Sequence, residues 1–141
     1  MVSDVFGEVG IAATYGLVGL VLMALGFVLV DVLTPGNLRE QIWVQRNRNA
    51  AILLASNVLG VGIIVATAIA ASQGNWGEGL LSTAAYGILG LVLMAVSFVV
   101  LDAVTPGKLG EIVVEETPHP AVYVNAASHI AVSAIVAVAI F

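Results

Sequence analysis

Cysteine is absent from the sequence, which excludes disulfide bonds, thiolate metal sites and a cysteine nucleophile. Charge is also scarce, because only 9% of the residues are charged whereas 60% are hydrophobic. So little polar surface cannot enclose a soluble core, and a lipid bilayer is therefore the solvent that this composition fits. Four basic residues against nine acidic ones leave a net charge of −5 and no basic stripe, which excludes a nucleic-acid partner.

Histidine occurs only as His119 and His129, and no Ser-His-Asp set, His-x-x-x-His pair or glycine-rich phosphate loop accompanies either. We therefore expect no catalytic residues, no metal site, no cofactor and no enzymatic activity. His119 lies between two prolines, where we expect a solvated turn residue. The N-terminal segment contains Asp4 and Glu8 but no basic residue, and since a secretory signal begins with positive charge, we expect this N-terminus to be retained.

Four long apolar runs dominate the chain, at about 12–33, 50–71, 83–104 and 122–141. Each is long enough to cross ~30 Å of hydrocarbon, since a helix rises ~1.5 Å per residue. The connections between them are too short to fold as a separate aqueous domain. The sequence therefore predicts an all-α membrane protein, a single transmembrane domain of four helices over residues 1–141.

An internal repeat relates the two halves of the chain with an offset of 71 residues. Residues 15–70 align without a gap on residues 86–141, and 24 of these 56 positions are identical. Each copy contains two spans, an even number, so both copies enter the membrane in the same orientation. We therefore expect a pseudo-two-fold axis along the membrane normal.

The basic residues indicate the orientation. Connection 34–49 holds Arg39, Arg46 and Arg48, and connection 105–121 holds Lys108. Both termini and the second connection hold no basic residue. The positive-inside rule makes these two connections cytoplasmic. Both termini are then expected outside.

A conspicuous block ends the first span of each repeat. It reads Asp31-x-x-Thr34-Pro35-Gly36-x-Leu38 in the first copy and Asp102-x-x-Thr105-Pro106-Gly107-x-Leu109 in the second. This duplicated block resembles the YjfL-like bacterial inner-membrane proteins, a family known as domain of unknown function 350. Asn49-Ala50-Ala51 is similar to the family's start of the next helix, whereas the second copy has Pro120-Ala121-Val122 instead. The resemblance implies a multi-pass protein of the bacterial inner membrane without an established activity.

Asp31 and Asp102 have two interpretations. Intramembrane carboxylates are costly and often functional, so the pair could line a proton or cation route. Alternatively, each lies at the interface and offsets the positive end of a short surface helix that begins after Thr34 or Thr105. Threonine as N-cap, followed by proline in the first helical position, favours the second interpretation.

The segment after Pro35 is amphipathic, with Leu38 and Ile42 one turn apart and charges opposite them. We expect a short interfacial helix there with Trp43 as its membrane anchor, and Trp76 as an anchor in the connection at the other interface. Basic clusters attract anionic lipids, so three arginines are candidates for headgroup binding beside their role in topology: Arg39, Arg46 and Arg48.

Small residues recur at helical spacing and allow helices to approach closely. The strips are Ala12-x-x-x-Gly16, Ser56-x-x-x-Gly60, Gly62-x-x-x-Ala66-x-x-x-Ala70 and Gly87-x-x-Gly90. Four helices offer more such faces than one small bundle needs. We therefore expect a homo-oligomer in the lipid bilayer, with other membrane proteins as further partners.

Polar side chains form a stripe on the last span, where Asn125, His129 and Ser133 follow one another at i, i+4 and i+8. At membrane depth this stripe must face protein or water, with Ser56 and Asn57 of the second span as candidate partners. It is either an interhelical hydrogen-bonded seam or part of a proton route, with Asp102 at its cytoplasmic mouth. The chain is therefore interpreted as a non-catalytic, self-associating envelope component, the alternative being a small channel or proton-coupled transporter that uses the stripe.

Overall fold

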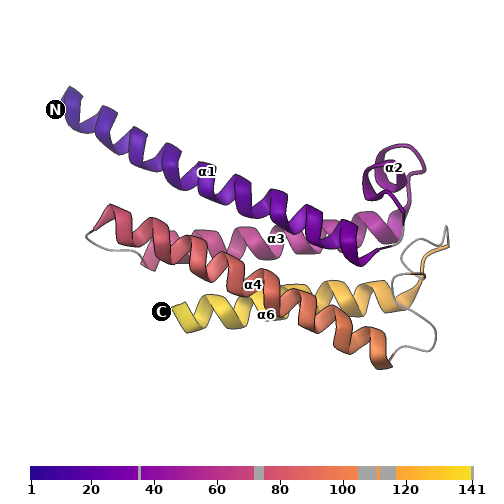
Figure 1. Cartoon of the computed structure of the whole chain (residues 1–141). Coiled ribbons are helices and arrows are strands. Elements are labelled where there is room, and N and C mark those ends of the chain that lie inside the picture. The colour runs from indigo at the N-terminus through magenta and orange to yellow at the C-terminus, as the bar shows by residue number, and fades with distance from the viewer. Residues whose placement is uncertain (35, 72–74, 105–110, 112–116, 141) are drawn as a thin grey trace.

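The computed structural model describes residues 1–34, 36–71, 75–104, 111 and 117–140, and the elements found there are helices. In chain order they are α1 Val2–Leu33, α2 Leu38–Trp43, α3 Arg48–Ala71, α4 Trp76–Val104 and α6 Pro120–Ile140 (Figure 1). The four long helices are each apolar and long enough to cross a membrane. This confirms the all-α fold with four spans.

The first and third spans are longer than predicted. α1 begins ten residues before position 12, and α4 begins at Trp76, not at residue 83. Hydropathy locates only the most apolar part of a helix, whereas both helices continue outward through segments that mix polar and apolar residues. Trp76 is consequently the first residue of a helix, and Asn75 precedes it as a cap whose side-chain oxygen accepts from the Gly77 N–H at 2.9 Å.

Helix α3 occupies the centre of the bundle and packs against α1, α4 and α6, most extensively against α6. Half of its most apolar segment is buried inside the chain, compared with 22 to 28% for the other three spans. The two halves do not pack equivalently, because α3 contacts α4 whereas the corresponding pair, α1 and α6, makes no comparable contact. The protein therefore departs from the symmetry that the repeat predicts.

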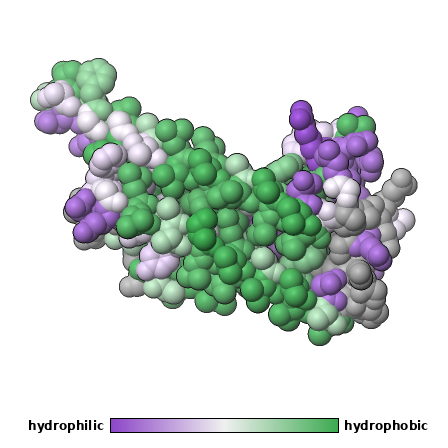
Figure 2. Space-filling model, viewed as in Figure 1, coloured by the Kyte–Doolittle hydropathy of each residue, from purple (hydrophilic) through white to green (hydrophobic). Residues whose placement is uncertain are grey.

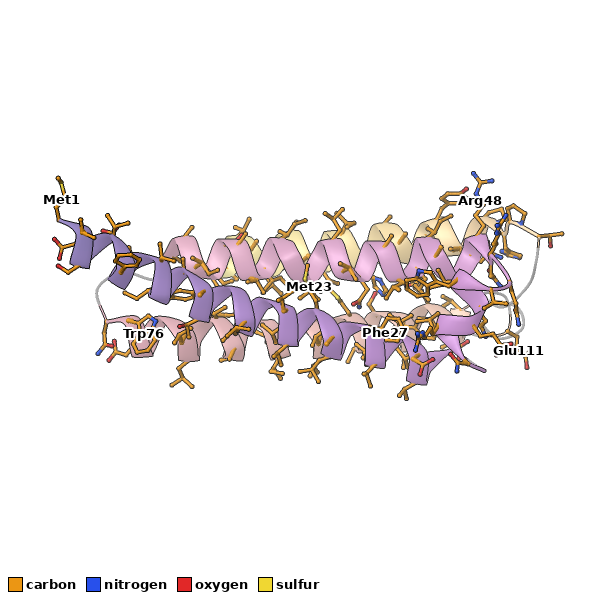
Figure 3. All side chains as sticks on the ribbon, turned by 90° about the horizontal axis from the view of Figure 1, so that it is seen from above. Met1, Met23, Phe27, Arg48, Trp76 and Glu111 are labelled. Atoms are coloured by element: carbon orange, nitrogen blue, oxygen red, sulfur yellow. The ribbon has the colours of Figure 1, made fainter. Side chains whose placement is uncertain are left out.

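The outer surface is apolar around the middle of the bundle. Figure 2 shows a continuous hydrophobic band on the face in view, with hydrophilic residues gathered towards both ends. Figure 3 places Met1 and Trp76 near one end of the bundle, and Arg48 and Glu111 near the other. This distribution matches a protein whose middle is solvated by lipid.

The connection between α1 and α3 is built differently from the sequence prediction. Thr34 closes α1, and its hydroxyl donates to the carbonyl of Val30 at 2.9 Å. The N-cap of α2 is Asn37, whose side-chain oxygen accepts from Glu40 N–H at 3.2 Å. The prediction that Thr34 is the N-cap of this short helix is therefore wrong, because the Thr34 hydroxyl is already bonded within the last turn of α1. The short helix after Thr34 is confirmed, whereas the one expected after Thr105, and Lys108, lie outside the described residues.

Candidate polar site in the helix core

The polar stripe of α6 faces the interior of the bundle. Asn125 and Ser133 have no exposed surface and His129 is 2% exposed. The Ser133 hydroxyl donates to the backbone carbonyl of His129 at 2.7 Å, which satisfies that hydroxyl within its own helix. The stripe therefore meets neighbouring helices and not the surrounding lipid.

Ser56 of α3 joins this stripe through a hydrogen bond of 3.1 Å between its Oγ and His129 Nδ1. The Ser56 hydroxyl also lies 2.7 Å from the carbonyl oxygen of Leu53, which can only accept. Because a hydroxyl has one proton to donate, Ser56 donates to Leu53 and accepts from the histidine ring. This arrangement fits the tautomer with a proton on Nδ1, and the bond orients the imidazole between α3 and α6.

Asn57, the second candidate partner, does not bond to the stripe. Its Nδ2 donates to the sulfur of Met94 in α4 at 3.4 Å, whereas its Oδ1 has no hydrogen-bond partner among the described residues. A Cβ added to Gly26 would collide with that Oδ1. Glycine at this position therefore lets α1 approach an amide that already contacts α4.

Gly60 allows α6 to approach α3 closely. A Cβ at this position would collide with the Ser133 hydroxyl and would lie 2.7 Å from Met94 Cε and 3.3 Å from the His129 carbonyl oxygen. The Ser56-x-x-x-Gly60 strip is thus used within the chain. Gly62, only two residues away, is on the opposite side of this interface, and its nearest neighbour would be Met23 Cε at 3.8 Å.

Asn125 is the most unusual member of the cluster. Its side chain is fully buried, yet neither its oxygen nor its nitrogen has a hydrogen-bond partner in the described part of the chain. A buried amide without a partner costs roughly 1–3 kcal/mol. The site therefore combines a histidine that is bonded through Nδ1 with an amide that makes no hydrogen bond among the described residues.

The two aspartates lie at helix ends. Asp31 is half-buried, and its carboxylate accepts from the backbone N–H of Leu38 at 2.9 Å, which ties the start of α2 to the end of α1. Asp102 is half-buried two residues before the end of α4. The bond made by Asp31 has a structural role of the kind expected for an interfacial carboxylate.

The charged and aromatic candidates lie around the same connection. Arg39 is in α2, Arg46 has a left-handed backbone with φ of 56° between α2 and α3, and Arg48 begins α3; all three are exposed. Trp43 is 64% exposed at the end of α2, and Trp76 is 47% exposed at the start of α4. Among the described residues, no group of three or more histidines and carboxylates could hold a metal ion.

Sequence reasoning missed a clamp between the two halves. The Asn49 side chain donates from Nδ2 to the Thr117 carbonyl at 2.9 Å and accepts from the His119 N–H at 3.3 Å. His119 is not merely a solvated turn residue, because its Nδ1 accepts from Ala121 N–H at 3.0 Å and so caps α6. Two features of the sequence could have indicated these bonds. One is the proline in the first position of α6, and the other is Asn49, which occurs in only one of the two repeats.

The comparisons with known proteins agree with this architecture. The family model described as Domain of Unknown Function (DUF350) matches residues 4–140. A UPF0719 transmembrane protein of Mycolicibacterium paratuberculosis is 34% identical over 126 residues, which cover 89% of this chain and 83% of the relative. UPF0719 transmembrane proteins of Mycobacterium bovis and Mycobacterium tuberculosis are each 37% identical over 133 residues, or 93% of this chain and 88% of theirs.

No solved structure matches the chain. The family model nevertheless covers almost the whole sequence, and the relatives align over most of their own lengths. The protein is therefore a multi-pass transmembrane member of the DUF350 family.

Proposed function

We propose that the protein is a non-catalytic, self-associating component of the bacterial inner membrane, built from two tandem repeats (15–70 and 86–141). The observation that carries this proposal is the polar contact that α3 makes with α6 in the core of the bundle. Ser56 and His129 bond to each other, and no Asp, Glu, Lys or Arg side chain is buried among the described residues. A seam of this kind holds helices together, since interhelical hydrogen bonds in membranes contribute ~1 kcal/mol each.

The outer part of α1 supports self-association. Residues 1–13 are exposed, and this end of the helix extends away from the other helices in Figure 1. Gly7, Gly10 and Gly16 have no neighbouring atom within 4 Å of an added Cβ. Glycine weakens an isolated helix by up to ~1 kcal/mol per residue, and most helices gain their stability from packing. The strip of Ala12 and Gly16 therefore suits a second copy of α1.

Leucine at both Ala12 and Gly16 is expected to weaken self-association about tenfold or more, because bulky side chains prevent close approach of two α1 helices. The dissociation constant can be measured by analytical ultracentrifugation in mild detergent and checked by subunit counting in nanodiscs. Ala134→Leu is the matched control, since Ala134 is an exposed small residue of α6 that lies outside the small-residue strips. A native protein that is monomeric in both media, or a control that weakens association equally, would refute this interface.

We also propose that the end of the bundle with α2 is cytoplasmic and that both termini are outside, since Arg39, Arg46 and Arg48 lie in or beside α2. Native cysteine is absent, so single cysteines at the exposed Gln45 and Glu78 can be labelled without background. With an impermeant maleimide on spheroplasts, we expect labelling at position 78 and none at position 45 until the membrane is opened. The reverse pattern would invert the topology.

A proton or cation route through the α6 stripe is the second candidate function. It is favoured by Asn125, whose buried amide has both polar atoms available to solvate a transported species. Against it, Asp31 is bonded to the start of α2, and the cluster is limited to a few side chains of α3 and α6 with Met94. A proton route would carry a proton flux across the membrane, whereas a seam that only packs helices would not.

A further inference from the structure

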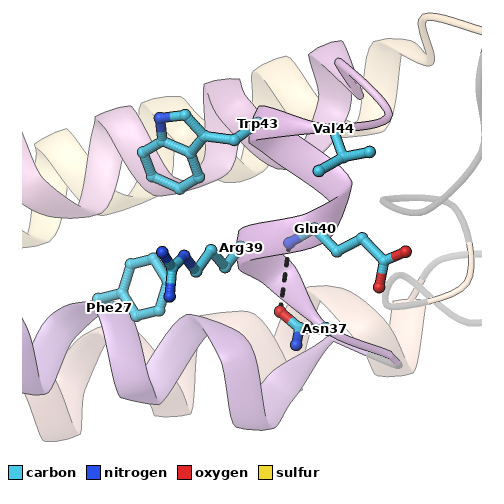
Figure 4. Close-up of a pocket in the computed structure, with 6 residues that line it drawn as sticks. All are labelled: Phe27, Asn37, Arg39, Glu40, Trp43 and Val44. Carbon is cyan, nitrogen blue, oxygen red and sulfur yellow. Dashed lines mark hydrogen bonds between the residues drawn. The ribbon is translucent and has the colours of Figure 1, made fainter.

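We propose that the pocket between the end of α1 and α2 binds an anionic phospholipid, with Arg39 contacting the phosphate and an acyl chain in the adjoining groove along α3. The pocket has a volume of about 630 Å³ and is lined by Phe27, Asn37, Arg39, Glu40, Trp43 and Val44 (Figure 4). It belongs to the surface of the bundle and is separate from the polar cluster of the core.

Two aromatic rings form the walls of this pocket. Phe27 of α1 and Trp43 of α2 have ring centroids 6.5 Å apart and planes inclined at 42°. In Figure 4 the Arg39 side chain extends towards Phe27, whereas the Glu40 side chain extends to the other side of α2. The side of the pocket next to Phe27 thus presents a guanidinium beside aromatic rings, while the Glu40 carboxylate, which also lines the pocket, is directed away from it. This combination is suited to a phosphate attached to hydrocarbon.

The charge of Arg39 is available for such a ligand. Among the described residues, no carboxylate lies within ion-pair distance of its guanidinium. A guanidinium offers a planar fork of donors that matches phosphate oxygens. The bond from Leu38 N–H to Asp31 holds the start of α2 against α1, which keeps Arg39 near the membrane surface on the side where the other two arginines lie.

A second cavity of about 640 Å³ adjoins the pocket and shares Trp43 with it. Small residues of α3 alternate with larger aliphatic ones along it, and the small ones are Ala51, Ala55, Gly62 and Ala66. Met23 and Ile42 also line it. From Ala51 to Ala66 the helix rises about 22 Å at ~1.5 Å per residue, which exceeds the depth of one leaflet, about half of ~30 Å. An acyl chain that starts at the headgroup pocket therefore has a continuous apolar path.

Of the three arginines that are candidates for headgroup binding, this geometry favours Arg39. Neither Arg46 nor Arg48 lines the pocket or the groove. A zwitterionic lipid would fill the groove equally well but would gain less from a single positive charge. The site should therefore discriminate by headgroup charge, and this discrimination should depend on Arg39.

The test uses tryptophan fluorescence, because the chain contains only two tryptophans. The Trp76→Phe variant leaves Trp43 as the reporter in phosphatidylcholine vesicles that contain either brominated phosphatidylglycerol or brominated phosphatidylcholine, with bromine near the headgroup end of the chain. We expect brominated phosphatidylglycerol to occupy the site at Trp43 about fivefold more readily, as one basic residue near the surface implies. Arg39→Gln should abolish this preference.

Two matched controls isolate the site. Arg46→Gln removes the same charge from the same connection and should retain the preference, while Trp76 in the Trp43→Phe variant should show none. Equal quenching by the two lipids, a preference that survives Arg39→Gln, or its equal loss in Arg46→Gln would overturn the proposal. Shielding of Trp43 from both brominated lipids would also overturn it and would indicate that another helix covers the groove.

Discussion

Alanine at Gly60 is expected to lower the free energy of unfolding by ~1–3 kcal/mol, whereas alanine at Gly62 should leave it unchanged or raise it by up to ~1 kcal/mol. At Gly60 the added methyl meets Ser133, Met94 and the backbone of α6, and backbone cannot give way. At Gly62 the nearest atom is the flexible end of Met23 at 3.8 Å. At Gly62 the added methyl therefore meets no clash, and the expected effect is the stabilisation that alanine gives a helix relative to glycine.

Each of the two variants adds one methyl group to the native protein, and the two positions lie two residues apart in α3. Unfolding can be followed by circular dichroism while SDS is titrated into a mild detergent. A combined difference of ~1–4 kcal/mol is expected, since the cost at Gly60 and any gain at Gly62 have opposite signs. Equal effects of the two substitutions would show that α6 does not pack on α3 at Gly60.

Leucine in place of Asn125 is expected to raise the free energy of unfolding by ~1–3 kcal/mol, an unusual gain for a fully buried polar position. The amide has no hydrogen-bond partner among the described residues, so its replacement removes a desolvation cost without breaking a bond. Leucine branches at the same carbon, although its methyl groups need somewhat more room. Asn125→Asp should act in the opposite direction and cost ~3–5 kcal/mol, because it places an uncompensated charge in the core.

The same variants separate packing from transport. Liposomes with an internal pH-sensitive dye should show no proton flux above empty liposomes for the native protein, for Asn125→Leu or for His129→Leu. If the native protein carries protons and both leucine variants do not, the stripe is a route and the packing proposal is wrong. Destabilisation by Asn125→Leu would contradict the stability prediction separately, since it would mean that the amide has a partner.

The sequence alone determined the fold class and the family of this protein. In a bilayer every backbone polar group must bond internally, so an apolar run of about 20 residues is itself sufficient to predict a spanning helix. The duplicated Asp-Thr-Pro-Gly block identified the family because hydrophobic composition cannot produce it by chance. Spacing also placed Asn125, His129 and Ser133 on one helix face, since the period of the helix depends on local geometry alone.

Only the tertiary structure decided which side chains meet. Helical spacing places Ser56 and Asn57 one residue apart, but it does not specify the height or the angle at which α6 crosses α3. Close approach at Gly60 brings His129 to Ser56, while Asn57 turns towards Met94. The helix ends also depend on bonds that the sequence pattern did not predict. Asn37, and not Thr34, caps α2, and the Asn49 side chain near the start of α3 bonds to the distant Thr117. Contacts between residues 68 apart in the chain leave no local signal, because they form only when whole helices pack.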